Sequence, residues 1–423
     1  MSSPPLPEHI PVPPRLRLRA GVAWTLGGQV VYSAAQWGMV ALLARLGRPQ
    51  DVGVFSLGLG LCAPLFLLLG LQLRSLQATD TGGHSPFQDY FSLRVLCMAL
   101  GLGAAAALGL LYPQAAAVIW WLGVTKALEG LSDVIYGLIQ RHERLDWVSR
   151  STQARGLLGL ALLGGLFALT GSVAWGAAGL ALAGAITLVA YDLPHARRLD
   201  RGPWLTRHIP AALPRLAAPL GLVIGLVSLT STLPRFFVEH ALGPRELGIY
   251  AALTYVTVAG SLVVTALGTA LTTRLAALFA GGEVRGFVGM TLRLLALAAL
   301  FGGGLSALAW WAGTPLLRTL YGPEYAAQAG TFVWLTVGGA LGYLASGLGF
   351  AVTAARQFRE QVPLFVLTTL ALALACGVLV PRAGLVGAAQ ATLAASSLQL
   401  LGSGLIVARA LRRSPAHPEE THV

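Results

Sequence analysis

The sequence predicts an all-α polytopic membrane protein whose twelve transmembrane helices form two parallel six-helix repeats. Three observations lead to this prediction: the composition, the spacing of the apolar runs, and a motif that occurs twice at corresponding positions. Of the 423 residues, 11% are charged and 55% are hydrophobic, and the mean hydropathy is +0.70. Soluble domains carry about 25% charged residues, so this chain lacks the polar surface that a soluble globule needs.

The apolar runs have the length of membrane-crossing helices. A helix that spans a bilayer needs about 20 apolar residues, and charges, prolines and glycine clusters divide the chain into twelve such runs. They cover residues 20–45, 51–73, 91–111, 115–137, 155–170, 173–191, 214–237, 246–268, 287–312, 325–353, 362–380 and 383–408. These runs leave no room for a sizeable soluble domain. The cysteines Cys62, Cys97 and Cys376 lie within them and indicate neither a disulfide framework nor a metal site.

A motif in the first half of the chain recurs in the second half. The stretch GRPQDVGVF at residues 47–55 returns as GPRELGIY at residues 243–250, with Pro49 matching Pro244 at an offset of 195 residues. The copies fall six spans apart, an even number that preserves direction, so the halves are predicted to be parallel repeats related by an axis along the membrane normal. Proline at a first helical position and an acidic residue in the first turn suit a helix start. We therefore interpret the motif as structural rather than catalytic.

The arginines predict the orientation, because cytoplasmic loops accumulate them. With a cytoplasmic N-terminus, 22 arginines fall on the cytoplasmic side and 6 on the outer side. The predicted organisation is a cytoplasmic N-terminal tail (1–19), a six-helix bundle (20–191), a cytoplasmic linker (192–213), a second six-helix bundle (214–408) and a cytoplasmic C-terminal tail (409–423). The same bias explains most of the net charge of +12 as a topology signal against anionic lipid, so we expect no nucleic-acid partner.

Three stretches of the chain carry a family resemblance. ALLARLGRPQDVGVFSLGLGL, LYGPEYAAQAGTFVWLTVGGAL and VPRAGLVGAAQATLAASSLQLL are similar to the corresponding stretches of bacterial oligosaccharide flippases. These proteins are the polysaccharide-exporting branch of the multidrug/oligosaccharidyl-lipid/polysaccharide superfamily, and the resemblance runs from residue 18 to residue 408. It implies two bundles in a V around a central cavity that opens alternately to either side. It also implies a cargo, a sugar chain on a polyprenyl diphosphate, turned over from the cytoplasmic to the outer leaflet of a bacterial inner membrane.

Such a cargo dictates the chemistry of its path. Its diphosphate and sugars cannot cross hydrocarbon unaided, while its lipid tail can stay in the bilayer, so the protein must supply a polar cavity with a lateral opening. Cationic side chains should line that cavity, because the headgroup is anionic. A charge at that depth costs at least about 2.5–3.5 kcal/mol if it faces lipid, so charged residues inside a span are expected to face the bundle interior or water.

Span four holds the conspicuous charged cluster, WWLGVTKALEGLSDVIYGL. Lys126 is the only lysine in the chain, and Glu129 and Asp133 follow at spacings of three and four, which place all three on one helical face. In one interpretation Lys126 contacts the anionic cargo while Glu129 or Asp133 exchanges protons during transport. In the other, Lys126 and Glu129 form an internal pair that only neutralises itself.

Further polar residues are weaker candidates for substrate contacts. Gln29, Tyr32 and Gln36 form a polar stripe on span one, for which hydrogen bonds between helices are the ordinary explanation. Arg74 lies at the inner end of span two and Arg235 near the outer end of span seven, where snorkelling is the alternative to binding.

Gating requires helices that bend. Pro219 interrupts span seven, and the 195-residue offset places it on Trp24 of span one, three residues before Gly27 and Gly28. We expect a hinge in both copies at these residues. The alternative is a static kink satisfied by neighbouring helices.

Two rival classes stay open. A multidrug or cation antiporter of the same superfamily would share the architecture. Such proteins commonly carry a coupling acid on span one, which this chain lacks. The acids of span four nevertheless keep this alternative open. A membrane polysaccharide polymerase or glycosyltransferase would need a site at the membrane surface, and the short outer loops offer neither paired acids nor metal-ligand spacing.

We therefore expect a flippase rather than an enzyme, without catalytic residues, cofactor or metal. Its expected partners are the lipid-linked oligosaccharide and membrane lipids. The sequence leaves open coupling to a proton or sodium gradient and contacts with a polysaccharide polymerase or glycosyltransferases.

Overall fold

The computed structural model describes residues 18–79, 85–206 and 208–413, so the predicted tails lie largely outside the described residues. The N-terminal half contains α1 (Leu18–Leu46), α2 (Pro49–Gly70), α3 (Leu73–Thr79), α4 (Phe87–Leu111), the 3-10 turn η1 (Pro113–Ala115), α5 (Ala116–Arg141), α6 (Leu145–Thr170), α7 (Val173–Thr187), the π-helical turn η2 (Leu188–Asp192) and α8 (Leu193–Leu199). The C-terminal half contains α9 (Ala212–Leu242), α10 (Pro244–Ala280), α11 (Val284–Leu320), α12 (Pro323–Ala326), α13 (Ala329–Ala354) and α14 (Phe358–Arg413).

The described residues contain nine helical stretches that are long and apolar enough to cross a membrane. α14 counts as one stretch among them but has two arms, and α1 and α5 fall outside this group although each is long enough to span. α1 carries the glutamines of the predicted polar stripe and α5 carries the charged cluster, and such side chains lower the hydropathy of a span. With both arms of α14 and these two helices, the described chain has the twelve predicted spans.

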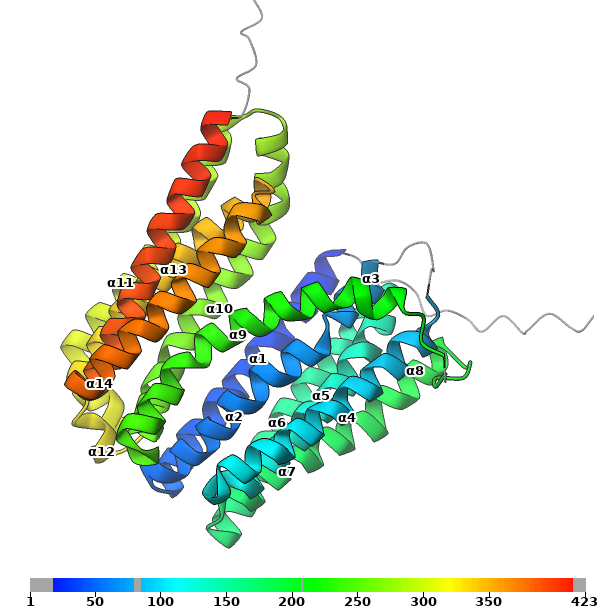
Figure 1. Ribbon diagram of the computed structural model, residues 1–423, viewed down its shortest axis with the longest axis horizontal. Coiled ribbons are helices and arrows are strands. Elements are labelled where there is room, and N and C mark those ends of the chain that lie inside the picture. The colour runs from blue at the N-terminus through cyan, green and yellow to red at the C-terminus, as the bar shows by residue number, and fades with distance from the viewer. Residues whose placement is uncertain (1–17, 80–84, 207, 414–423) are drawn as a thin grey trace, which may run out of the picture.

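The two arms of α14 meet at a sharp reversal. Gly384 has φ 59° and ψ −136°, outside the helical region, and Pro381 just before it removes a helix hydrogen bond. Figure 1 shows the two arms, orange and red, running side by side in opposite directions. These arms correspond to the predicted spans 362–380 and 383–408.

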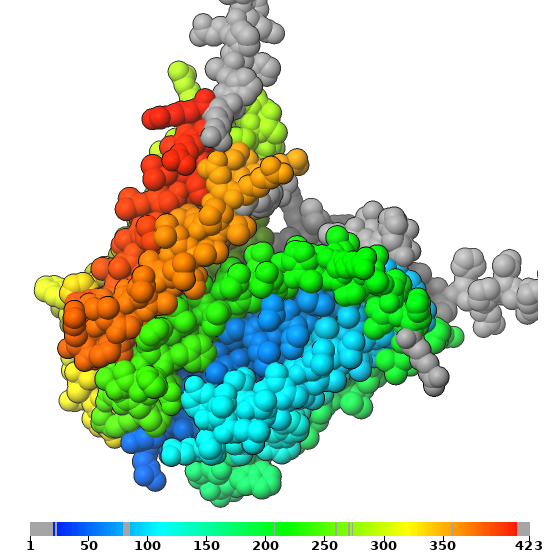
Figure 2. Space-filling view, in the orientation of Figure 1, coloured from blue at the N-terminus to red at the C-terminus, as the bar shows by residue number. Residues whose placement is uncertain are grey.

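The two halves form two bundles that diverge as a V (Figure 1). They separate at the end where α1 begins and α14 finishes, which we call the terminal end. They meet at the opposite end, which holds the turns before α2 and α10 and which we call the motif end. In the space-filling view α9, in green, arches over α2, in blue (Figure 2), and these two helices are in direct contact.

The two copies of the repeated motif touch each other at the motif end. A Cβ atom added to Gly53 would collide with the carbonyl oxygen of Pro244, and one added to Gly248 would collide with that of Pro49. Each glycine also faces the backbone nitrogen of the other. The contact is therefore reciprocal, as expected of parallel repeats related by a two-fold axis, and it holds the bundles together where α2 crosses α10.

The motif also begins a helix in each half, as its sequence predicts. α2 begins at Pro49 and α10 at Pro244, and each has an acidic residue in its first turn. In the first copy the Asp51 carboxylate accepts a hydrogen bond of 2.8 Å from the backbone N–H of Arg48. The reciprocal contact between the copies was not part of the sequence prediction.

Candidate functional site

A polar cavity of ≈ 380 Å³ lies on the inner face of the N-terminal bundle, where α9 passes it. Among the described residues, its charged lining consists of Arg74, Arg94, Lys126, Glu129, Asp133 and Arg155. All six come from the N-terminal half, whereas α9 contributes the apolar Ile224. An anion in this cavity therefore meets four cationic and two acidic side chains.

Lys126 and Glu129 form an ion pair in the wall of this cavity. The Lys126 Nζ atom donates to Glu129 Oε2 at 2.7 Å, and the two side chains are 18% and 23% exposed. The other carboxylate oxygen of Glu129 accepts a hydrogen bond of 3.1 Å from the Tyr32 hydroxyl of α1. An ammonium group has three donors, so Lys126 can hold Glu129 and still donate to an anion in the cavity.

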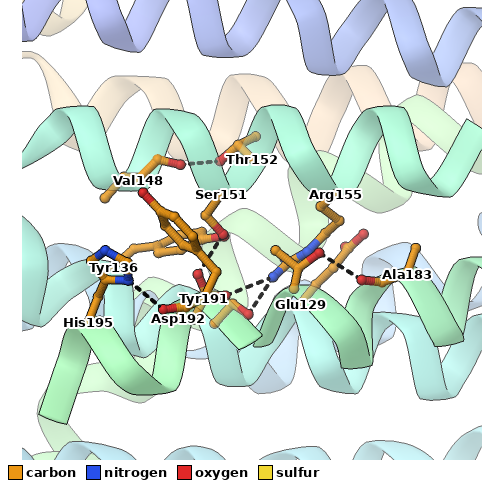
Figure 3. A network of polar contacts seen from close by, with 12 residues as sticks. Glu129, Tyr136, Val148, Ser151, Thr152, Arg155, Ala183, Tyr191, Asp192 and His195 are labelled. Atoms are coloured by element: carbon orange, nitrogen blue, oxygen red, sulfur yellow. Dashed lines mark hydrogen bonds and ion pairs between the residues drawn. The ribbon is translucent and has the colours of Figure 1, made fainter. Parts of the chain in front are cut away.

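Arg155 anchors a buried polar network that the sequence analysis did not identify (Figure 3). Its Nη2 atom lies 3.2 Å from Asp192 Oδ2 and also donates to the Ser132 hydroxyl of α5. The other carboxylate oxygen of Asp192 accepts a hydrogen bond of 2.5 Å from Ser151. Asp192 is fully buried at the end of the π-helical turn η2, and such turns often accompany functional sites. The network fixes Arg155 where α5, α6 and η2 meet.

We expect Asp192→Leu to lower the free energy of unfolding by about 3–5 kcal/mol, because it leaves a buried guanidinium without its carboxylate. The double variant Arg155→Met/Asp192→Leu removes both charges and should recover most of that loss. Thermal unfolding of the purified protein in detergent measures both effects. A single variant as stable as the wild type would show that the pair does not stabilise the bundle.

Two further cavities continue the polar one towards the α1–α10 seam. A small cavity of ≈ 40 Å³ shares Tyr32, Lys126 and Glu129 with the polar cavity. It shares Gln36 and Tyr255 with an apolar groove of ≈ 460 Å³. The groove lies between α1 and α10, and its apolar lining includes Val30, Trp37, Val256, Val258, Leu262 and Val263. The polar cavity and the apolar groove at the boundary between the bundles are thus both neighbours of the small cavity.

The opposite seam of the V, between α2 and α9, is packed closely. A Cβ atom on Gly221 would lie 2.9 Å from the Leu71 side chain, and one on Gly225 would lie 2.9 Å from Leu68 Cβ. The glycines therefore let α9 lie directly on α2. The apolar groove belongs to the α1–α10 seam.

No family model matches the chain. Among curated proteins, the capsular polysaccharide biosynthesis protein CapF of Staphylococcus aureus is 23% identical over 359 residues, covering 83% of this chain and 89% of that protein. Among solved structures, the lipid II flippase MurJ in an inward closed conformation matches with a TM-score of 0.73 and 11% identity, covering 91% of this chain and 90% of that one. An inward-facing multidrug resistance MATE family transporter of the MOP superfamily matches with a TM-score of 0.69 and 14% identity, covering 92% of this chain and 96% of that one.

The chain has the fold of the multidrug/oligosaccharidyl-lipid/polysaccharide superfamily. This fold agrees with the resemblance seen in the sequence, and it confirms the predicted arrangement of two parallel six-helix repeats. The chain is accordingly a multi-pass membrane protein with a transporter fold. Because one solved relative is a multidrug transporter and the other a lipid flippase, the superfamily fold by itself fits both classes.

The structure brings most of the predicted site residues together. Gln29, Tyr32 and Arg74 line the polar cavity beside the α5 cluster, and Gln36 lies deeper, where the small cavity meets the groove. Arg235 does not line these three cavities, but its guanidinium is 5.7 Å from the centre of the ring of Tyr255, which lines the small cavity and the groove. The substrate-binding role of each residue stays a prediction.

The predicted hinge residues differ in their surroundings. A Cβ on Gly27 would meet nothing within 4 Å, whereas one on Gly28 would collide with the Ser149 side chain of α6. Pro219 lies inside the continuous helix α9. Gly28 thus allows α1 to pack closely against α6, and bending at Gly27, Gly28 or Pro219 stays a prediction.

Three residues of the site were not predicted from the sequence: Arg94 and Arg155, which line the polar cavity, and Asp192, the buried partner of Arg155. Both arginines entered the charge count as cytoplasmic topology signals, and Asp192 was placed in the linker. Arg155 stood at the first residue of a predicted span, but α6 begins at Leu145 and places it nearly three turns inside the helix. The available signal was the polar run DWVSRSTQAR before that span, which is compatible with a helix whose polar side faces a cavity.

Proposed function

We propose that this protein is a flippase that moves a polyprenyl-diphosphate-linked oligosaccharide from the cytoplasmic to the outer leaflet by alternating access. The observation that carries the proposal is a cation-lined cavity and an apolar groove that each share wall residues with one small cavity. An amphiphile with an anionic headgroup needs both environments at once: the charged part must avoid hydrocarbon, and the tail need not leave it. The groove at the α1–α10 seam offers the tail a lateral route.

The proposed membrane is a bacterial inner membrane, with both termini cytoplasmic as the arginine distribution predicts. In that orientation the V is open to the cytoplasm, where a lipid-linked oligosaccharide is assembled, and closed at the motif end. Glycosyltransferases would deliver the cargo on the cytoplasmic side, and a polysaccharide polymerase would consume it outside. Coupling to a proton or sodium gradient belongs to the same proposal, with Glu129 and Asp133 as the carboxylates facing the cavity.

A multidrug or cation antiporter is the second candidate, favoured by those same two carboxylates in the cavity. A cation would bind them only by competing with the lysine and arginine side chains that already pair with them. Electrostatic repulsion from four cationic lining residues therefore weighs against this candidate.

Disruption of the gene in the source bacterium tests the proposal. We expect sugar-loaded polyprenyl diphosphate to accumulate in the cytoplasmic leaflet and surface polysaccharide to fall, with both effects reversed by a plasmid copy. Extraction of the lipid fraction after surface labelling of the outer leaflet measures the distribution. Drug sensitivity without such accumulation would reject the flippase and support the antiporter.

A further inference from the structure

A second cationic cluster lies nearer the terminal end than Lys126. Asp133 follows Lys126 by seven residues, which is about 10 Å along α5 at about 1.5 Å per residue. Its Oδ1 atom is 3.6 Å from Arg74 Nη1, and its Oδ2 atom is 3.0 Å from Arg94 Nη2. One carboxylate therefore joins two guanidinium groups that come from different helices, α3 and α4.

Arg94 is built into this place. Its side chain is 3% exposed, and its buried Nε–H has no hydrogen-bond partner among the described residues. Gly70, the last residue of α2, makes room for it: a Cβ there would lie 2.9 Å from Arg94 Nη1. A buried guanidinium needs an anion beside it, and in this structure the Asp133 carboxylate is that anion.

Arg74 is positioned by its own set of contacts. Its Nε–H donates to Gln140 Oε1 at 3.2 Å, and its guanidinium lies 5.5 Å from the centre of the Tyr136 ring. The chain reaches Arg74 through Leu71 and Gln72, which have φ values of 52° and 51°. Left-handed conformations are strained for residues other than glycine, and such strain persists where the surroundings enforce it. The break between α2 and α3 thus turns Arg74 towards the cavity.

We propose that Arg74 and Arg94 form a phosphate-binding site at the mouth of the cavity, which the diphosphate of a lipid headgroup occupies before it reaches Lys126. When no headgroup is bound, the Asp133 carboxylate pairs with both arginines of this mouth site. The headgroup displaces this carboxylate when it binds. Guanidinium groups suit phosphate oxygens because they offer several donors in a fixed plane. Asp133 is 38% exposed to the cavity, so its side chain can rotate aside. This inference rests on the flippase function proposed above.

If the mouth site binds diphosphate, substitution of its carboxylate and substitution of its arginines should change the affinity in opposite directions. Asp133→Asn removes the internal competitor and should tighten diphosphate binding several-fold, although a tighter first site should slow transport. Arg74→Gln should weaken binding about tenfold, the loss expected for one charge-assisted hydrogen bond. Arg141→Gln is the matched control, because Arg141 is an exposed arginine at the end of the same helix α5 and does not line the cavity. Arg94→Gln removes the second guanidinium and should also weaken diphosphate binding relative to Arg141→Gln.

Calorimetric titration of the full-length protein in detergent tests this with three probes: inorganic pyrophosphate, farnesyl diphosphate and phosphatidylglycerol. We expect both diphosphates to bind, with Arg74→Gln weaker and Asp133→Asn tighter than Arg141→Gln. Equal affinities in Arg74→Gln and Arg141→Gln, or weaker binding in Asp133→Asn, would overturn the mouth site. Phosphatidylglycerol that binds as tightly as farnesyl diphosphate would also overturn it, because the site would then recognise bulk lipid phosphate.

Lys126→Ala separates failure of the mouth site from failure of the flippase function. If Lys126→Ala loses diphosphate binding and Arg74→Gln does not, the result supports an anionic cargo and rejects the mouth site. If the wild-type protein binds neither diphosphate, both proposals fail together.

Discussion

If the proposed function is correct, we expect Lys126→Ala to reduce translocation of the lipid-linked oligosaccharide by about 10- to 100-fold, the loss of one hydrogen bond to a charged group, while the protein still inserts and folds. Lys126 is the only lysine in the chain, and its ammonium group lies between the polar cavity and the small cavity that leads to the apolar groove. Without it, Glu129 faces the anionic cargo uncompensated and repels it. The measurement is the rate at which reconstituted proteoliposomes turn over a labelled polyprenyl-diphosphate oligosaccharide.

The double variant Lys126→Ala/Glu129→Ala distinguishes the two interpretations of this pair. If the pair only neutralises itself, removing both charges restores transport. If Lys126 contacts the cargo, the double variant stays impaired, because the attractive base is still missing although the repulsive acid is gone. Lys126→Arg keeps the charge and should retain part of the activity. Normal transport by Lys126→Ala at normal expression would remove Lys126 from the cargo path.

The sequence was sufficient to predict the spans and the parallel repeat, because these depend on local apolar runs and on an even offset between two motif copies. It failed where polar residues continue a helix. The first turns of α6 contain Asp146, Ser149 and Ser151, all buried, yet no apolar run marks them, so the predicted span began ten residues late. Arg155 consequently looked like a loop residue.

The charged cluster of α5 could be predicted because its three members lie on one helix at helical spacing. The arginine partners of Asp133 could not, since Arg74 and Arg94 come from α3 and α4 and only the packing of those helices against α5 brings them there. Arginine serves both as a topology signal and as an anion ligand. Its position in the sequence does not separate the two roles.

Gly53→Ala and Gly248→Ala should each hold the protein open at the motif end and reduce transport nearly to background. A Cβ at either position meets the backbone of Pro244 or Pro49 in the other bundle, and a backbone carbonyl cannot rotate away as a side chain does. The bundles must therefore separate by the room that a methyl group needs. Alanine ordinarily stabilises a helix relative to glycine by about 0.5–1 kcal/mol, so a loss of transport cannot be attributed to a weaker helix.

A cysteine at Thr125 reports which end of the cavity is open. Thr125 is buried and lines the small cavity between Lys126 and the motif-end contact, and the three native cysteines are buried. With Gly53 and Gly248 intact, a membrane-impermeant thiol reagent should reach this cysteine mainly from the terminal end. In either glycine variant it should react from the motif end as well.

Gly103→Ala is the matched control for the glycine variants, because Gly103 lies on α4 and a Cβ there meets nothing within 4 Å. It should leave both transport and labelling unchanged. Because each glycine faces the proline of the other motif copy, the two alanine variants should have equal effects. Gly53→Ala with normal transport and labelling only from the terminal end would show that the bundles accommodate the methyl group, and the repeated motif would then be no more than a helix start.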